Sequence, residues 1–300
     1  MIESTKTTYE GLQCIQLKND FLAIWVTRDV GPRILGLSFL GGKNMLAVLP
    51  GEKIPVTGAD DYSLRGGHRL WYAPEKPETT YIADDQPVEI SILEHGLEAI
   101  RVVDQATGIQ KSWRVTLSDS EAELTIDHKL TNKGSKDFQL APWAVTMLKP
   151  GGQGVIPLQT ELDDEHGLWP NRQLVFWPYT DLRSPYLDWH DQGIMVKANM
   201  TEGALKMGAP NPGGWMAYNL EGSLFVKRTE YQAGDDYLDR GASSQIYCNP
   251  DLIELETLGP VVTLAPGEFS QHQETWQIYA EGNWPGEIKQ LFDLFQIQQK

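Results

Sequence analysis

The stretch Ile109-Gln110-Lys111-Ser112-Trp113-Arg114-Val115-Thr116-Leu117 alternates apolar and polar side chains, and Lys111 breaks its apolar side once. The segment 123–131 (ELTIDHKLT) repeats this alternation. Side chains of a β-strand point alternately to its two faces, so a period of two predicts strands that each bury one face. Turn residues, Thr107-Gly108 and Asn132-Lys133-Gly134, precede the first strand and follow the second.

Similar alternating runs continue along the chain. They occupy 21–28, 88–93, 98–103, 223–229, 252–258 and 271–279. Gly41-Gly42, Glu221-Gly222 and Pro266-Gly267 supply further turns. Many short strands separated by glycine-rich turns predict an all-β sandwich or barrel. No linker and no repeat interrupts the pattern, so we expect a single domain over residues 1–300.

One helix is predicted, near the C-terminus. After Pro285, apolar residues recur at the helical spacing i, i+3, i+4 and i+7, namely Ile288, Leu291, Phe292 and Phe295. This spacing gathers the four side chains on one side of a helix. We therefore expect a short amphipathic helix that covers one face of the sandwich.

Composition restricts the partners. The 300 residues include 25 Lys and Arg against 41 Asp and Glu, a formal net charge of −16. Nucleic acids and anionic membranes attract basic surfaces, so neither is an expected partner. Residues 1–20 lack the apolar segment of a signal peptide, and no apolar run is long enough to span a bilayer, so we expect a cytoplasmic location. The oligomeric state stays open.

Metal and cofactor sites are not expected. Cys14 and Cys248 are too few for a metal set; we expect free thiols, with a disulfide between them as the alternative. The acidic segments 163–166 (DDEH) and 188–191 (DWHD) contain metal-type ligands without a recognised spacing. No phosphate-binding loop or dinucleotide fingerprint occurs.

The segment Arg65-Gly66-Gly67-His68-Arg69-Leu70-Trp71, followed by Ala73-Pro74-Glu75, is the first candidate for chemistry. Paired glycines allow a tight bend. Arg65 and Arg69 offer planar forks of donors to ligand oxygens, and Trp71 offers a flat apolar face to the C–H bonds of a sugar. The alternative is a turn whose arginines pair with nearby acids and whose tryptophan fills the core.

The second candidate is the segment Ile253–Pro260 (IELETLGP). Strand alternation puts Glu254 and Glu256 on the same face. Two carboxylates so close raise the pKa of at least one of them, which makes a candidate proton acceptor. The alternative is a solvated strand face. Ten tryptophans add possible stacking surfaces, because several lie in expected loops: Trp169, Trp177, Trp189 and Trp215.

Together the two segments resemble the galactose mutarotase-like superfamily. Leu64–Trp71 (LRGGHRLW) is similar to the Arg-Gly-Gly segment of its hexose-6-phosphate mutarotase branch, in which the arginine faces the sugar. Ile253–Gly259 resembles the late strand that delivers the catalytic glutamate, and the match falls on Glu256. Val261–Ile278 is similar to the closing hairpin of these folds. The longer motif Gly66–Glu75 looks most like a separate branch, distinct from the true aldose 1-epimerases.

The resemblance implies a large, mostly antiparallel β-supersandwich that binds a small carbohydrate on a concave sheet face. It implies that Glu256 takes the proton of the sugar's C1 hydroxyl. The superfamily's general acid is a mid-chain histidine, but the matching region, Gln139–Val145, presents Trp143, whose indole is no acid at neutral pH. We expect His68 to substitute as the acid.

The leading hypothesis is therefore an aldose 1-epimerase-like isomerase. Glu256 and His68 would be its catalytic residues, and the substrate would contact Arg65, Arg69, Trp71, Trp143 and Glu254. One alternative is a non-catalytic sugar-binding or sensing module, which the missing histidine favours. Another is a lyase or an epimerase acting elsewhere on the sugar, since a fold does not fix a reaction.

Overall fold

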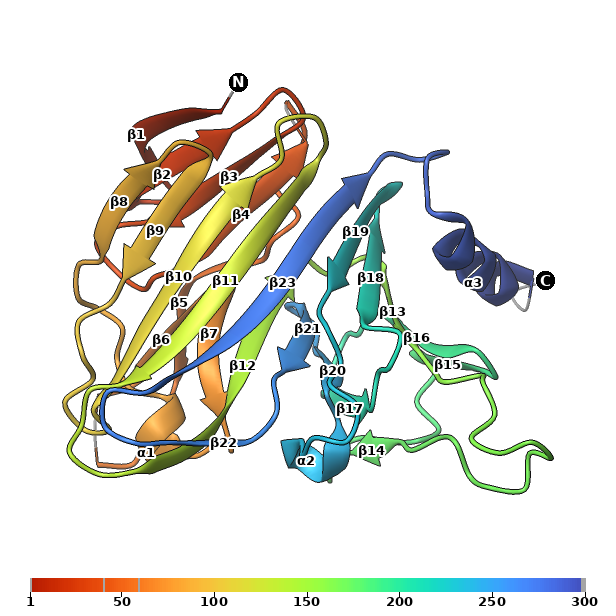
Figure 1. The fold of residues 1–300 in the computed structure, drawn as a ribbon. Coiled ribbons are helices and arrows are strands. Elements are labelled where there is room, and N and C mark those ends of the chain that lie inside the picture. Colours follow the sequence, from red (N-terminus) through yellow and green to blue (C-terminus); the bar gives the residue numbers. More distant parts are fainter. Residues whose placement is uncertain (1, 40, 59, 298–300) are drawn as a thin grey trace.

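Two large β-sheets lie face to face in the computed structural model, which describes residues 2–39, 41–58 and 60–297 (Figure 1). The first sheet, in spatial order, contains β1 (Glu3–Tyr9), β2 (Leu12–Lys18), β3 (Leu22–Thr27), β4 (Ile34–Phe39), β7 (His68–Ala73), β12 (Phe138–Leu148), β21 (Ile253–Leu258), β20 (Ser244–Cys248), β17 (Leu205–Ala209) and β14 (Val175–Phe176), with β22 (Val262–Leu264) paired to β12.

The second sheet runs in the order β15 (Leu187–His190), β16 (Gly193–Lys197), β13 (Gln153–Pro157), β18 (Trp215–Leu220), β19 (Ser223–Arg228), β23 (Phe269–Tyr279), β11 (Glu123–Asn132), β10 (Ile109–Leu117), β9 (Gly96–Ile100) and β8 (Glu89–Leu93). A separate hairpin joins β5 (Val48–Ile54) and β6 (Tyr62–Gly66). The helices are α1 (Pro77–Thr80), α2 (Leu238–Gly241) and α3 (Gly286–Ile297).

The alternating stretch at 109–131 forms the antiparallel pair β10–β11, with Trp113 opposite His128. Trp113, Val115 and Ile126 are buried in the core between the sheets. Lys111, the break in the apolar side, is buried as well, and its ammonium lies 5.2 Å from the centre of the Tyr72 ring. The predicted all-β, mostly antiparallel sandwich is confirmed.

The main core lies between the two sheets and joins residues from Ile15 to Ile278. The helix α3 covers the outer face of the second sheet, at the end opposite β8 and β9 (Figure 1). Its four predicted apolar residues are buried there against residues that include Val155, Met195 and Trp215. The predicted helix is therefore confirmed, and it lies on the second sheet, away from the outer face of the first.

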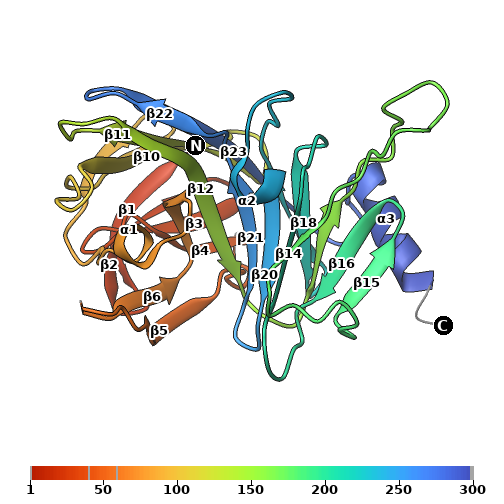
Figure 2. The same cartoon turned by 90° about the horizontal axis from the view of Figure 1, so that it is seen from below.

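Cys14 and Cys248 are free and buried, as expected. Among the described residues, no helix is both long and apolar enough to cross a membrane. The connection between β13 and β14 extends away from the sheets (Figures 1 and 2). The outer face of the first sheet carries a smaller apolar cluster, around Tyr62, Trp71 and Trp143, on which the hairpin β5–β6 packs. This face holds the candidate site.

Candidate functional site

A pocket of about 470 Å³ opens on the outer face of the first sheet. Its size falls within the ~300–1,000 Å³ typical of small-molecule sites. Five neighbouring strands form its floor, in the order β7, β12, β21, β20 and β17. The lining residues are Ile54, Leu64, Arg69, Trp71, Glu75, Tyr81, Trp143, Met147, Tyr179, Ala204, Lys206, Tyr247, Asn249, Leu252 and Glu254. Four predicted substrate-binding residues, Arg69, Trp71, Trp143 and Glu254, are thus brought together.

Register explains why these side chains meet. In the paired strands, Trp71 of β7 lies opposite Trp143 of β12, and Met147 lies opposite Glu254 of β21. Tyr247 of β20 lies opposite Glu254 on one side and Lys206 of β17 on the other. Residues that pair directly across strands share a face. The line of paired residues across the pocket floor therefore consists of Met147, Glu254, Tyr247 and Lys206.

The two carboxyl groups of β21 occupy different positions. Glu254 lines the pocket, whereas Glu256, on the same strand, is fully buried and does not line it. Burial, and next the neighbouring Glu256, raise the pKa of Glu254 to about 8. Near neutral pH the Glu254 carboxyl therefore carries its proton. The predicted rise in pKa is therefore present, and it is found on Glu254, the carboxyl group that faces the pocket.

Two donors bind the side chain of Glu256. Trp143 Nε1 donates to its Oε2 at 2.6 Å, and Lys206 Nζ donates to the same oxygen at 2.8 Å. Glu256 Oε1 has no hydrogen-bond partner within the described chain. Burial opposes the charge of Lys206, but Glu256 outweighs it and raises the lysine's pKa. Glu256 therefore forms a buried ion pair with Lys206 next to Glu254.

The guanidinium of Arg69 is buried, but its N–H donors have few good hydrogen-bond acceptors. It is 3% exposed and lies 3.9 Å above the Trp71 ring. One of its terminal nitrogens, Nη1, donates to the Met147 thioether at 3.3 Å, and the other, Nη2, lies 3.6 Å from Glu254 Oε1. No described group accepts from its Nε. Buried donors without good acceptors are costly, so this side chain is prepared for a ligand acceptor.

The two indoles offer less open surface than expected for stacking. Trp71 is 6% exposed and Trp143 is 4% exposed, with their ring centres 5.1 Å apart. Arg69 covers part of Trp71, and Lys206 lies 5.0 Å from the Trp143 ring centre. Tyr179 is half exposed and presents a more open ring to the pocket.

The paired glycines bend the chain as predicted. Gly66 and Gly67 have φ values of +81° and +72°. A Cβ atom would lie 2.2 Å from Ala47 O at Gly66 and 2.3 Å from Ile34 O at Gly67, so no larger residue fits. The bend carries Arg65 away from the pocket, where it forms ion pairs with Asp84 and Asp85. For Arg65 the alternative, pairing with nearby acids, is the one observed.

His68 requires a correction. It neighbours Arg69 in β7, so strand alternation turns it to the inner face of the sheet. Its Nε2 lies 2.8 Å from His128 Nε2 on the facing sheet, and its Nδ1 lies 3.0 Å from Thr146 Oγ1. Burial holds the pKa of His68 well below its usual value. The expected approach of His68 to Glu256 across one pocket therefore does not occur.

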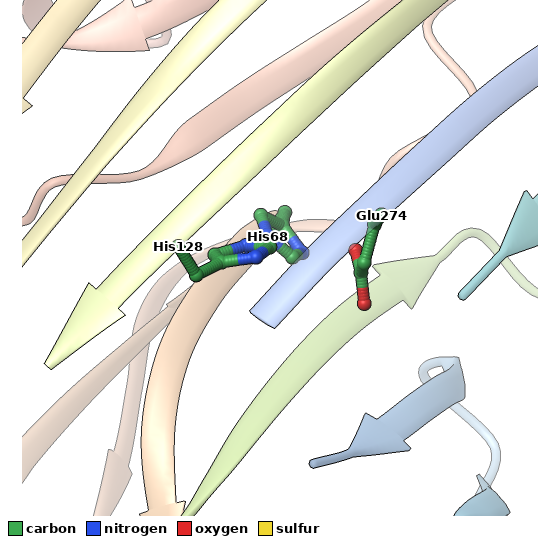
Figure 3. Close-up of side chains that lie close together, drawn as sticks. All are labelled: His68, His128 and Glu274. Atoms are coloured by element: carbon green, nitrogen blue, oxygen red, sulfur yellow. Dashed lines mark hydrogen bonds between the residues drawn. The ribbon is translucent and has the colours of Figure 1, made fainter. Parts of the chain in front are cut away.

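His68 belongs to a buried polar network between the sheets. Figure 3 shows His68, His128 and Glu274, whose candidate ligand atoms all lie within 4.8 Å of one another. Lys227 Nζ lies 2.8 Å from Glu274 Oε1. The other Glu274 oxygen accepts a hydrogen bond from Trp276 Nε1 at 2.9 Å.

The network fits a metal ion poorly. Glu274 already binds a lysine ammonium, and Thr257 Oγ1 donates to it as well. His128 Nδ1 lies 2.9 Å from the carbonyl oxygen of His272, so it donates there and leaves Nε2 to accept from His68. A cation would have to displace Lys227, which is itself positively charged. The arrangement is a satisfied network that links the two sheets.

Sequence reasoning missed Lys206 and the tyrosines of the pocket. Lys206 lies between Leu205 and Met207 in a five-residue strand, so alternation marks it as facing away from the core. The alternation of β17 could have identified Lys206, but it covers only a few residues. Tyr81 and Tyr179 lie in connections outside the strands, where no periodicity indicates direction. Tyr81 donates a hydrogen bond to Glu75, another lining residue.

No family model matches this sequence, and a search of curated proteins returns no match. Solved structures do match the fold. A TPR-domain containing protein from Parabacteroides distasonis superposes with a TM-score of 0.63 over 89% of this chain, at 14% identity. This chain spans about half of that protein, 47% of its length.

Two further structures match over nearly their whole length. A galactose mutarotase-like protein from Clostridium acetobutylicum has a TM-score of 0.56, covers 93% of this chain and 98% of its own, and is 12% identical. Another, from Lactobacillus casei, has a TM-score of 0.55, covers 89% of this chain and 100% of its own, and is 10% identical. The predicted galactose mutarotase-like β-sandwich is therefore confirmed as the fold.

Proposed function

We propose that this chain binds a carbohydrate of monosaccharide size in the pocket and interconverts its anomers. The observation that carries the proposal is the pair Glu254 and Glu256, in which a neutral carboxyl faces the pocket beside a buried, ion-paired glutamate of the same strand. Anomer interconversion needs one proton delivered to the ring oxygen and one removed from the C1 hydroxyl. A neutral carboxyl supplies both functions, because its O–H donates while its C=O accepts.

In this mechanism Glu254 is the catalytic residue. Its O–H protonates the ring oxygen while its carbonyl oxygen takes the proton of the C1 hydroxyl. The bond between C1 and the ring oxygen breaks, and C1 becomes the carbonyl carbon of the open chain. Rotation about the C1–C2 bond and the reverse transfer close the ring as the other anomer. After ring opening the carboxyl is neutral with its proton on the other oxygen, and the reverse transfer during ring closure returns the proton to the first oxygen.

Glu256 acts as a positioning residue in this scheme. It is fully buried and bound by Lys206 and Trp143, so it does not line the pocket. Its negative charge helps to keep the proton on Glu254 near neutral pH. This revises the role expected from sequence, in which Glu256 touches the sugar as the base.

The test follows anomer interconversion by polarimetry or NMR with wild type, Glu254→Gln and Glu256→Gln. Glu254→Gln should lose about 10²–10⁴-fold in rate, the usual contribution of general acid–base assistance. Wild-type activity should fall above pH about 8, as Glu254 loses its proton. Glu256→Gln should keep activity but move this fall to lower pH, because the pKa of Glu254 drops when the neighbouring charge is removed.

A full rate with Glu254→Gln would disprove its catalytic role. An unshifted pH profile with Glu256→Gln would disprove the positioning role. Wild type that binds a sugar without speeding its anomerisation would leave a sugar-binding module as the function. That second candidate rests on the absence of any histidine among the residues that line the described pocket.

A further inference from the structure

The charge on the pocket floor is unbalanced. Arg69 and Lys206 contribute two positive charges, and Glu256 contributes one negative charge. Glu254, raised to a pKa of about 8, is neutral near pH 7. Glu75 also lines the pocket, but its side chain is exposed and screened by water. A buried positive excess favours a ligand that brings a negative charge.

Arg69 is the group that lacks a counter-ion. Lys206 has its own carboxylate at 2.8 Å, whereas the nearest carboxyl to Arg69 is that of Glu254, at 3.6 Å and mostly protonated. Its other hydrogen-bond acceptor is the Met147 thioether, which is a weak one. The Trp71 ring beneath the guanidinium holds its plane in place. Planar, fixed guanidiniums match carboxylates in a two-point geometry.

We infer that the natural ligand of the pocket is an acidic sugar, a uronate whose carboxylate pairs with the guanidinium of Arg69. This inference rests on the proposed function, because it assumes that the pocket takes a carbohydrate. A carboxylate suits the site better than a phosphate. The unpaired charge is a single arginine, whereas a phosphate monoester carries close to two negative charges.

The groups that face Glu254 set the charge on which this inference depends. They come from several elements: Glu256 on β21, Arg69 on β7, Lys206 on β17, Tyr247 on β20, and Tyr81 and Tyr179 in connections. The tyrosines have raised pKa values, first because of burial, so they stay neutral up to alkaline pH. Glu254 is then the group whose charge changes near pH 8, and its ionisation would oppose an acidic ligand.

The experiment compares matched ligands by calorimetry at fixed ionic strength. Galacturonate and glucuronate are set against their methyl esters, which keep the shape without the charge, and against galactose, glucose and their 6-phosphates. Wild type should bind a uronate about tenfold to a hundredfold more tightly than its ester, the range of a charge-assisted hydrogen bond. This preference should shrink above pH about 8, as Glu254 ionises.

Arg69→Gln should abolish the preference for acid over ester. Arg114→Gln, which removes an exposed arginine on the other sheet, is the matched control and should keep it. If Arg69→Gln does not fold, Arg69→Lys replaces it and should lose most of the preference, because a lysine keeps the charge without the planar fork.

Equal affinity for acid and ester would overturn the acidic-sugar inference and leave the proposed function intact. Tighter binding of a 6-phosphate than of any uronate would overturn the choice of carboxylate. Failure of every sugar to bind would overturn both the inference and the proposed function. A preference that survives Arg69→Gln would show that another group recognises the acid.

Discussion

The raised pKa of Glu254 bears on stability as well as on the proposed reaction. Its pKa in the folded chain, about 8, lies above the ordinary value of 4.5. Between these values the folded state holds more protons at this site than the unfolded state, so its contribution to stability falls as pH rises. Below pH 4.5 both states are protonated and the site is neutral to stability.

We therefore predict that Glu254→Gln stabilises the protein near pH 8, by about 1–3 kcal/mol, and changes little near pH 4.5. Glutamine keeps the shape of the neutral acid and cannot ionise. Urea unfolding of both proteins from pH 4.5 to 8.5 measures the difference, which should grow with pH. Comparing the two proteins cancels other titrating groups, such as Lys111. A difference that does not vary with pH would contradict the raised pKa.

The prediction that His68 faces the pocket is wrong for a simple reason. The expectation for His68 treats the polar side chains of 65–71 as one group around the paired glycines. The turn ends at Gly67, and residues 68–73 continue as β7. Within a strand, Arg69 and Trp71 share a face that His68 cannot. Glu254 and Glu256 share a face, as predicted, because a single residue, Leu255, separates them in an alternating run.

Among the elements, α3 and the pocket are independent. The helix packs on the outer face of the second sheet, whereas the pocket opens on the outer face of the first. Phe292 is fully buried in α3, and its ring centre lies 5.2 Å from that of Trp284. Changes at Phe292 should therefore affect stability without reaching the site.

Phe292→Ala should lower the free energy of unfolding by about 3–5 kcal/mol, the usual cost of removing a buried phenyl ring. Ligand affinity, measured under conditions where the variant stays folded, should match wild type. Lys289→Ala on the exposed side of the same helix is the control and should change stability by no more than about 0.5 kcal/mol. Affinity lost with Phe292→Ala alone would show that helix and pocket are coupled.

Element boundaries show what the sequence could predict. The strands at 109–117 and 253–258 follow clear alternation, and both fall where expected. Long-range pairing was beyond reach: β12 lies between β7 and β21, which are more than 170 residues apart. The pocket exists because of that order, so the resemblance to a known fold, and not periodicity, brought residues 65–71 and 253–259 together.

At the scale of the whole molecule, the two sheets are joined by hydrogen bonds from a buried ion pair of the second sheet, as well as by apolar packing. Lys227 and Glu274 are both fully buried and 2.8 Å apart, and Lys227 also donates to the carbonyl oxygens of Ala144 and Leu255 on the first sheet. Burial alone would raise the pKa of Glu274, but Lys227 and the nearby histidines hold it well below its usual value.

Lys227→Met should destabilise the protein by about 3–5 kcal/mol, because it leaves Glu274 charged and buried without its partner. The double variant Lys227→Met with Glu274→Gln should recover much of this loss, since neither charge remains. Thermal and urea unfolding of the two variants test the prediction. Equal losses in the single and double variants would mean that the destabilisation comes from the lost hydrogen bonds to the first sheet and not from the unpaired charge of Glu274.

The alternation of β21 also constrains how this protein can evolve. Ile253 and Leu255 belong to the core between the sheets, whereas Glu254 and Glu256 serve the pocket. A point mutation at Glu254 or Glu256 can change which ligand is favoured while the core stays intact. Insertion or deletion of one residue exchanges the two faces at once and ruins both. Ligand preference is thus open to gradual change through substitution, while natural selection must preserve the length of this strand.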